Sequence, residues 1–119
     1  MRFSNPTNTV LEKRISALEG GAAAVSFASG MAAISSTLLN LAKAGDEIIS
    51  VNTLYGGSTT LLAKLFPDYG ITPRFAADEN DIDAYRRLIN DHTRAIYIEC
   101  LGNPGINILD IEAIAALAH

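Results

Sequence analysis

The sequence predicts an α/β fold, a mostly parallel, doubly wound sheet with helices on both faces. Segments with helical periodicity alternate with short apolar runs along the 119 residues. The apolar runs are continuous, which is typical of strands buried on both faces. Because strand and helix follow each other repeatedly, we expect parallel strands joined by helical crossovers.

The composition is that of one globular domain with a hydrophobic core. Hydrophobic residues make up 49% of the chain, and the formal net charge of −4 is spread without a basic stripe, which argues against a nucleic-acid partner. No apolar run is long enough for a membrane span, and no signal segment precedes the first helix. A single cysteine excludes an internal disulfide, so the cytoplasm is the expected compartment.

The chain opens with an N-terminal segment and a first helix, predicted over residues 1–22. Asn5 is suited to cap this helix and Pro6 to occupy its first position. Thr9 and Glu12 have capping-box spacing and offer a later start. After the helix, residues 23–28 are predicted to form a buried strand that leads directly into a second helix.

The later elements continue the alternation. Strands are predicted at 47–51, 71–77 and 95–101, and helices begin at Ser58 and after the capping residues Asp81 and Asp110. Pro67 should disturb the helix that begins at Ser58, and Pro73 favours an edge position for its strand. The inward positions of that helix are expected to be Leu61, Leu62, Leu65 and Phe66.

The joint at Ser29-Gly30-Met31, where strand meets helix, is a candidate anion site. The first amide hydrogens of a helix lack intrahelical partners and lie at the positive end of its dipole. Gly30 lets an anion approach the backbone because it has no side chain. The alternative is an ordinary strand-to-helix joint without a ligand.

Other loops should meet this joint, because the strand-to-helix loops of a parallel sheet lie at one edge. They carry Tyr55, Asp78 and Asn103. An anion site, an aromatic ring and an amide at one edge suit a flat, phosphorylated cofactor. Alternatively, Tyr55 packs on the helix that follows it and Asn103 forms a turn before Pro104.

Other site chemistries find little support. The sequence lacks a G-x-G-x-x-G run after the first strand, a G-K-[ST] motif and a G-x-S-x-G motif. His92 and His119 are isolated, which argues against a metal site, and Cys100 is expected to fill the core. Glu99 lies in an otherwise apolar strand, so it needs a partner or a place near the end of the strand.

Several short motifs occur together along the chain. They are Asn5-Pro6-Thr7, Leu18-Glu19-Gly20-Gly21, Ser29-Gly30-Met31-Ala32, Leu54-Tyr55-Gly56-Gly57-Ser58 and Gly102-Asn103-Pro104. In combination they resemble the Cys/Met-metabolism family of pyridoxal-phosphate enzymes, over essentially the whole chain. The resemblance implies a fold-type I transferase with pyridoxal 5′-phosphate as its cofactor. Residues 23–119 would then be part of its large, cofactor-binding domain.

The resemblance also implies roles for individual residues. The amides of Gly30 and Met31 would hold the cofactor phosphate. Tyr55 would stack on the cofactor ring and assist proton transfer at the substrate, and Asn103 would bond near the cofactor's 3-oxygen. Arg2 would reach the phosphate bound by a neighbouring subunit. The parent enzyme would therefore be a homo-oligomer, such as a homotetramer, that shares active sites between subunits.

Two functional residues of the family have no counterpart, namely the Schiff-base lysine and the aspartate that pairs with the ring nitrogen. The lysines are Lys13, Lys43 and Lys64, and none follows a predicted strand at the ligand edge. The chain is therefore expected to be a piece of a longer enzyme and inactive by itself.

Segments 54–60 and 102–119 are most similar to the O-acetylhomoserine sulfhydrylase branch of the family. The implied reaction replaces acetate by sulfide or a thiol and serves methionine biosynthesis. The alternatives within the family are cystathionine γ-synthase, cystathionine γ-lyase and methionine γ-lyase, and a further alternative is a non-catalytic fragment.

Overall fold

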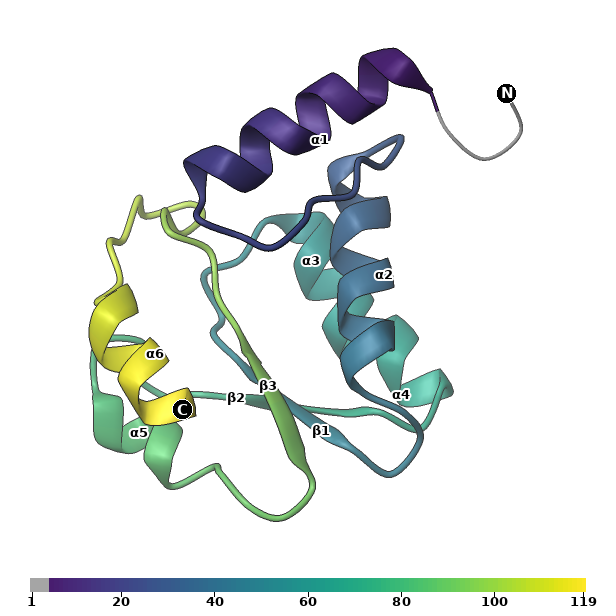
Figure 1. The fold of residues 1–119 in the computed structure, drawn as a ribbon. Coiled ribbons are helices and arrows are strands. Elements are labelled where there is room, and N and C mark those ends of the chain that lie inside the picture. Colours follow the sequence, from purple (N-terminus) through teal and green to yellow (C-terminus); the bar gives the residue numbers. More distant parts are fainter. Residues whose placement is uncertain (1–4) are drawn as a thin grey trace. The chain divides into compact units, whose positions relative to one another are not determined.

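The computed structural model describes residues 5–119, and the chain divides into two compact units, residues 1–33 and 34–119 (Figure 1). In the first unit, helix α1 spans Pro6–Leu18. Asn5 caps it by accepting a hydrogen bond of 2.9 Å from the Thr7 amide, and Pro6 takes the first position. The earlier of the two predicted starts is therefore confirmed. The Glu12 carboxylate in turn accepts hydrogen bonds from the Ser26 amide and hydroxyl, at 2.9 and 2.8 Å.

The predicted strand at residues 23–28 is wrong. This segment is irregular, and the side chains of Val25 and Phe27 are 72% and 44% exposed. A strand needs a neighbour for its backbone N–H and C=O groups, and no described strand pairs with this segment. The apolar run that predicted a strand is therefore not enough to form one. Helix α2, Gly30–Leu41, follows as predicted.

The second unit is built on a parallel sheet in the order β2-β1-β3. Strand β1 is Glu47–Ser50, β2 is Thr72–Phe75 and β3 is Thr93–Tyr97. Ile48 and Ile49 of β1 alternate between the two faces, and both are fully buried. The sheet is thus covered on both sides, by α3 and α4 on one face and by α5 and α6 on the other (Figure 1). Pro73 lies in the edge strand β2, as predicted.

The predicted helix that contains Pro67 is divided into three parts. Helix α3 is Gly56–Thr60, a π-helical turn η1 is Leu61–Leu65 and α4 is Phe66–Asp68. The Phe66 amide donates to the Leu61 carbonyl, five residues back. Pro67 has no N–H to donate in any helix, and in a normal α-turn its ring would press on the Ala63 carbonyl. A π-turn widens the helix at this point.

This wider turn explains one wrong prediction. Leu61, Leu62 and Phe66 are buried, as expected, but Leu65 is 45% exposed. The extra residue in the turn shifts the inner face by one position. Phe66 therefore takes the buried position, and Leu65 is turned toward solvent.

Two short helices complete the second unit. Helix α5 is Ile82–Arg86, and Asp81 caps it through the Asp83 amide at 2.9 Å. Helix α6 is Ile111–Ala118, and Asp110 caps it through the Ala113 amide at 3.0 Å. Both predicted caps are confirmed.

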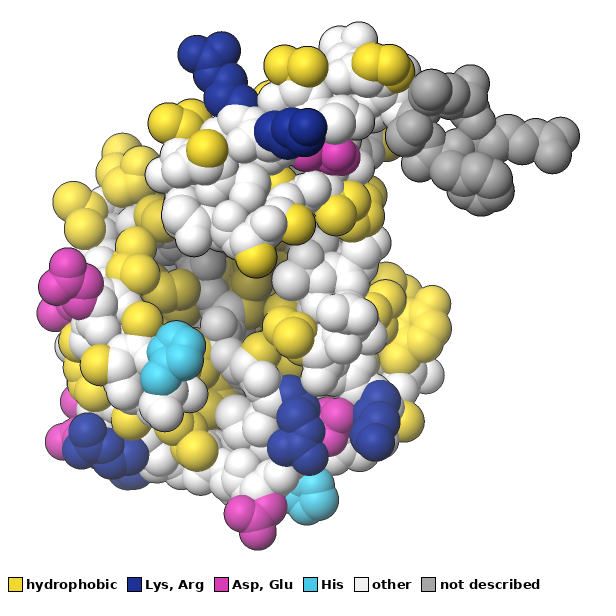
Figure 2. All heavy atoms as spheres, viewed as in Figure 1, with side chains coloured by type: hydrophobic (Ala, Val, Ile, Leu, Met, Phe, Trp, Pro, Cys, Tyr) yellow, Lys and Arg dark blue, Asp and Glu magenta, His cyan; other side chains and the backbone are white. Residues whose placement is uncertain are grey.

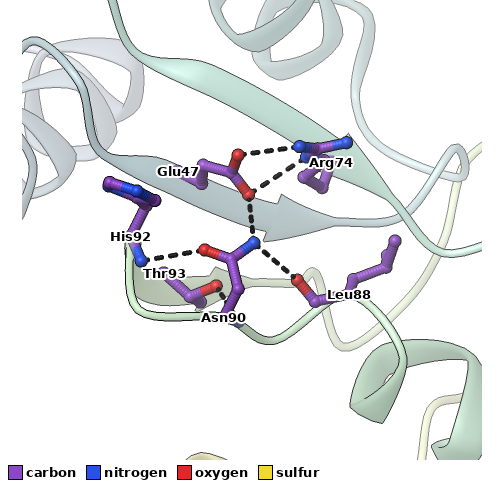
Figure 3. A network of polar contacts seen from close by, with 6 residues as sticks. All are labelled: Glu47, Arg74, Leu88, Asn90, His92 and Thr93. Atoms are coloured by element: carbon purple, nitrogen blue, oxygen red, sulfur yellow. Dashed lines mark hydrogen bonds and ion pairs between the residues drawn. The ribbon is translucent and has the colours of Figure 1, made fainter.

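A polar network lies at the amino end of β1 (Figure 3). Glu47 accepts two hydrogen bonds from the Arg74 guanidinium, at 2.8 and 3.0 Å, and one from Asn90 Nδ2 at 2.8 Å. The Asn90 side chain also accepts a bond of 2.8 Å from the His92 amide. These bonds hold the pKa of Glu47 below its ordinary value, with the bond from Arg74 as the main cause. The network joins β1, β2 and the turn before β3 at the edge of the sheet opposite the loops that follow the strands.

Candidate functional site

The loops after β1 and β3 carry two of the predicted site residues. Tyr55 ends the first loop directly before α3, and its side chain is 59% exposed. Asn103 lies in the loop between β3 and α6 and is also exposed. Because both loops leave the carboxyl ends of parallel strands, they lie at the edge of the sheet where α/β folds bind ligands.

Direct contacts hold these two loops together. The backbone N–H of Asn103 donates a hydrogen bond of 3.0 Å to the backbone carbonyl of Thr53. The neighbouring Gly102 is buried, and a Cβ atom there would lie 3.0 Å from the Thr53 Cβ and 3.2 Å from the Thr53 carbonyl oxygen. The close approach of the two backbones therefore depends on the missing side chain of Gly102. It brings the loop of Tyr55 and the loop of Asn103 side by side.

Glu99 makes a second connection between the loops. One carboxylate oxygen accepts a hydrogen bond of 2.8 Å from the Tyr55 amide. The other accepts from the Ser58 hydroxyl at 2.7 Å and from the Tyr97 hydroxyl at 3.1 Å. These donors confirm the expectation that Glu99 has a partner. Strand β3 ends at Tyr97 and not at the predicted residue 101, so Glu99 lies just after it.

The surroundings of Tyr97 favour its neutral phenol. Burial raises the pKa of Tyr97, and the negative charge of Glu99 raises it further, while the hydrogen bond with Ser58 acts in the opposite direction. A tyrosine is protonated near neutral pH even at its ordinary pKa of about 10, so the phenol serves as a donor to Glu99.

Glu79, in the loop after β2, is a residue that the sequence reasoning missed. Its carboxylate accepts hydrogen bonds from Thr53 Oγ1 and Asn107 Nδ2. Its backbone carbonyl accepts one of 2.8 Å from the Tyr85 hydroxyl. Burial, together with the charges of Glu79 and Asp78, raises the pKa of Tyr85 to about 12.

Asp78, also predicted at this edge, lies in the loop after β2. Its carboxylate accepts a hydrogen bond of 2.9 Å from the Asn80 amide, within the same turn. A recess of about 320 Å³ opens beside this turn, and it is lined by Asn52, Thr53, Ala76, Ala77, Asp78, Glu79 and Asn80. The position of Glu79 after a strand was the available signal, but its partners could not be read from the sequence pattern.

Gly30 and Met31 belong to the first unit, at the start of α2. Ser29 precedes them and accepts hydrogen bonds from the Ala32 amide at its hydroxyl and from the Ala33 amide at its carbonyl, both 3.1 Å long. A Cβ atom at Gly30 would meet nothing within 4 Å. The backbone of Gly30 is therefore open to a neighbouring group. Arg2 lies outside the described residues.

The expectation that Cys100 fills the core is wrong. It is exposed, because it lies in the loop after β3 and not within that strand. Among residues 5–119, no group of three or more His, Cys, Asp or Glu side chains could hold a metal ion. Within the same residues, no helix is long and apolar enough to cross a membrane.

The parallel sheet with helices on both faces belongs to the α/β class. Folds of this class bind their ligands at the carboxyl edge of the sheet, where the loops of Tyr55 and Asn103 lie. The family of the chain follows from the sequence, because residues 1–119 match the sequence model of the family described as Cys/Met metabolism PLP-dependent enzymes. The chain belongs to this family.

The similar proteins include sulfhydrylases and a lyase. The O-acetyl-L-homoserine sulfhydrylase of Leptospira meyeri is 49% identical over 117 residues, which are 98% of this chain and 26% of that protein. An L-methionine gamma-lyase of Fusobacterium nucleatum is 44% identical, over 99% of this chain and 30% of that protein.

One solved structure is an O-acetylhomoserine (thiol)-lyase from Campylobacter jejuni that contains N′-pyridoxyl-lysine-5′-monophosphate. It is 44% identical and superposes with a TM-score of 0.92, over 98% of this chain and 29% of that one. The chain thus spans between a quarter and a third of the length of these relatives.

Proposed function

We propose that this chain is part of the cofactor-binding domain of a pyridoxal-phosphate-dependent O-acetylhomoserine sulfhydrylase. The observation that carries the proposal is the pairing of the Tyr55 and Asn103 loops at the carboxyl edge of the sheet, through the Asn103 amide and Thr53 at 3.0 Å. The 49% identity to the Leptospira meyeri sulfhydrylase supports this branch of the family.

The residues present fit part of such a cofactor. Tyr55 has a largely exposed ring on a backbone held by Glu99, and such a ring can stack on a flat heterocycle. The exposed Asn103 has a carboxamide that both donates and accepts hydrogen bonds. Gly30 offers open backbone at the amino end of a helix of 12 residues, where a phosphate is favoured.

The proposed division of work follows from these groups. When bound, pyridoxal phosphate supplies an electron sink for carbanions of an amino-acid substrate. Tyr55 orients the ring by stacking, and its hydroxyl moves a proton at the substrate side chain. Asn103 binds near the cofactor's 3-oxygen, and the amides of Gly30 and Met31 bind the phosphate. In the overall reaction, acetate leaves O-acetylhomoserine and sulfide takes its place to give homocysteine.

The rest of the enzyme would supply the lysine that carries the cofactor. Lys43 lies just after α2, and Lys13 and Lys64 lie within α1 and η1, so none stands in a loop at the carboxyl edge of the sheet. We further propose a cytoplasmic homo-oligomer, such as a homotetramer. In it, Arg2 would bind the phosphate held by a neighbouring subunit, since a guanidinium binds phosphate oxygens in pairs.

Product analysis on the full-length enzyme tests the activity. The enzyme is given O-acetylhomoserine with sulfide, and separately methionine or cystathionine alone. We expect homocysteine and acetate from the first mixture and little turnover in the others. Rapid release of 2-oxobutanoate from methionine alone would instead establish a γ-lyase, the alternative that the Fusobacterium nucleatum relative favours.

A second experiment tests whether the 119 residues are catalytic by themselves. The purified chain is mixed with pyridoxal phosphate, treated with borohydride and analysed by peptide mass mapping. We expect no specific adduct at Lys13, Lys43 or Lys64 and no turnover. A single modified lysine together with homocysteine formation would overturn this expectation.

A further inference from the structure

We propose that Glu99 is a positioning residue that fixes the Tyr55 backbone and thereby the stacking ring. The inference rests on the proposed function, because it assumes that Tyr55 contacts the cofactor. Tyr55 itself is poorly restrained by packing, since the residue is 59% exposed. Its placement must therefore come from the backbone.

The restraint on that backbone comes from the loop after β3. The Tyr55 amide donates a bond of 2.8 Å to one oxygen of Glu99. The second oxygen accepts from the Ser58 hydroxyl at 2.7 Å, one turn further along α3. A single carboxylate thus binds both ends of the first turn of α3. The rotation of this turn about the helix axis sets the direction in which the Tyr55 side chain extends from the backbone.

Glu99 is itself held in place. The Tyr97 hydroxyl donates to it at 3.1 Å. Ser58 is fully buried, so its hydroxyl needs a partner inside the protein. Three donors therefore converge on the carboxylate, and hydrogen bonds to a charged group are about twice as strong as neutral ones.

The test uses variants of the full-length enzyme. Glu99→Leu removes both acceptors at similar size. Glu99→Gln keeps an oxygen for the Tyr55 amide, and its NH2 group can donate to the hydroxyls of Ser58 and Tyr97, which then turn to accept. Glu112→Leu, at an exposed position of α6, is the matched control for the loss of a carboxylate.

The first measurement is hydrogen–deuterium exchange on peptides that resolve the Tyr55 amide, in the protein without cofactor. We expect Glu99→Leu to accelerate exchange at this amide by about tenfold or more, as the loss of a hydrogen bond to a charged group predicts. Glu112→Leu should stay close to the unaltered enzyme, and Glu99→Gln should fall between it and Glu99→Leu, because the Gln oxygen still accepts the bond but carries no charge. Unchanged exchange in Glu99→Leu would overturn the proposal.

The second measurement is a double-mutant cycle on cofactor affinity and on the visible circular dichroism of the bound cofactor. If Glu99 acts through the ring, Glu99→Leu weakens binding in the unaltered background and adds almost nothing in a Tyr55→Ala background. Fully additive losses would show a merely structural role. If Glu99→Leu fails to fold, Glu99→Asp is used in its place. The Asp side chain is shorter by one methylene, so its carboxylate should no longer reach the Tyr55 amide.

These readouts separate the two proposals. If the unaltered full-length protein binds no pyridoxal phosphate, the proposed function fails. The exchange measurement on the protein without cofactor still decides whether Glu99 fixes Tyr55. If the cofactor binds but Glu99→Leu changes neither exchange nor dichroism, the role of Glu99 fails while the proposed function stands.

Discussion

Gly102 shows how one missing side chain can decide the geometry of two loops. A Cβ atom there would approach Thr53 to 3.0 Å at its side chain and 3.2 Å at its carbonyl. We expect Gly102→Ala to push the loops apart, to lengthen the bond from the Asn103 amide to Thr53 and to weaken cofactor binding. The expected loss of unfolding free energy is about 1 to 3 kcal/mol, which is typical of overpacking.

Thermal unfolding and cofactor titration of the full-length enzyme measure both effects. Gly21→Ala serves as the control, because its Cβ would meet its nearest neighbour at an ordinary 3.6 Å. Equal behaviour of the two variants would contradict the role assigned to Gly102.

Glu47 gives a prediction about pH. Its pKa is lowered in the folded protein, mainly by the hydrogen bonds from Arg74 and then by that from Asn90. The stability from this carboxylate is thus fully present above the ordinary glutamate pKa and is lost as pH falls through the lowered value. Glu47→Gln should therefore lower the unfolding free energy at pH 7, by about 1 kcal/mol since Arg74 is half exposed.

The difference between the unaltered protein and Glu47→Gln should shrink as the pH drops below about 4. Denaturant unfolding at several pH values measures it. Asp83→Asn is the control, because the ion pair of Asp83 with Arg86 is largely exposed on both sides. A gap that stays constant with pH would contradict the account of Glu47.

At the scale of single elements, helix α6 depends on its cap. The helix has eight residues, and the Asp110 carboxylate accepts the Ala113 amide at 3.0 Å. Removal of an N-cap side chain costs about 0.5 to 2 kcal/mol, so Asp110→Ala should destabilise α6 by about this amount. Faster amide exchange over residues 111–118 would report it. Asp110→Ser should restore most of the protection, and equal exchange in both variants would exclude a capping role.

The elements also show what the sequence could and could not predict. Local signals were sufficient where the cause is local, as with the caps Asn5, Asp81 and Asp110 and with the break at Pro67. The segment 23–28 failed because a strand depends on a partner elsewhere in the chain. The position of Leu65 failed because a π-turn shifts the register of the buried face.

The same distinction holds for the candidate site. The order of strands and loops placed Tyr55 and Asn103 at one edge, since this follows from parallel topology. The hydrogen bonds that the Glu79 carboxylate accepts from Thr53 and Asn107 could not be predicted, because they join three loops separated along the chain. The core position predicted for Cys100 is wrong because the apolar run continues past Tyr97, whereas β3 ends there.

At the scale of the whole molecule, the open side of β3 has consequences for the isolated chain. Among the described residues β3 pairs only with β1, so no neighbouring strand lies along its other edge. An apolar groove beside it is lined by Ile89, Thr93, Arg94, Ala95, Ile96, Leu117 and Ala118. Hydrophobic side chains also stand at the surface of both units (Figure 2).

Such edges and apolar surfaces promote association. We therefore expect the 119-residue chain to aggregate when expressed alone and to bind hydrophobic dyes, whereas the full-length enzyme should do neither. Analytical ultracentrifugation and calorimetry test this directly. A soluble monomer with one sharp, cooperative melting transition would refute the expectation.

The hydrogen bonds of Glu79 have a consequence for how the loops after β1 and β3 tolerate insertions. One carboxylate is shared by Thr53, in the segment that leads to Tyr55, and by Asn107, in the segment that contains Asn103. Neither loop can then be lengthened or redirected without disturbing the anchor of the other. We therefore expect lone insertions in either loop to be poorly tolerated, and paired alterations in both loops to be tolerated better.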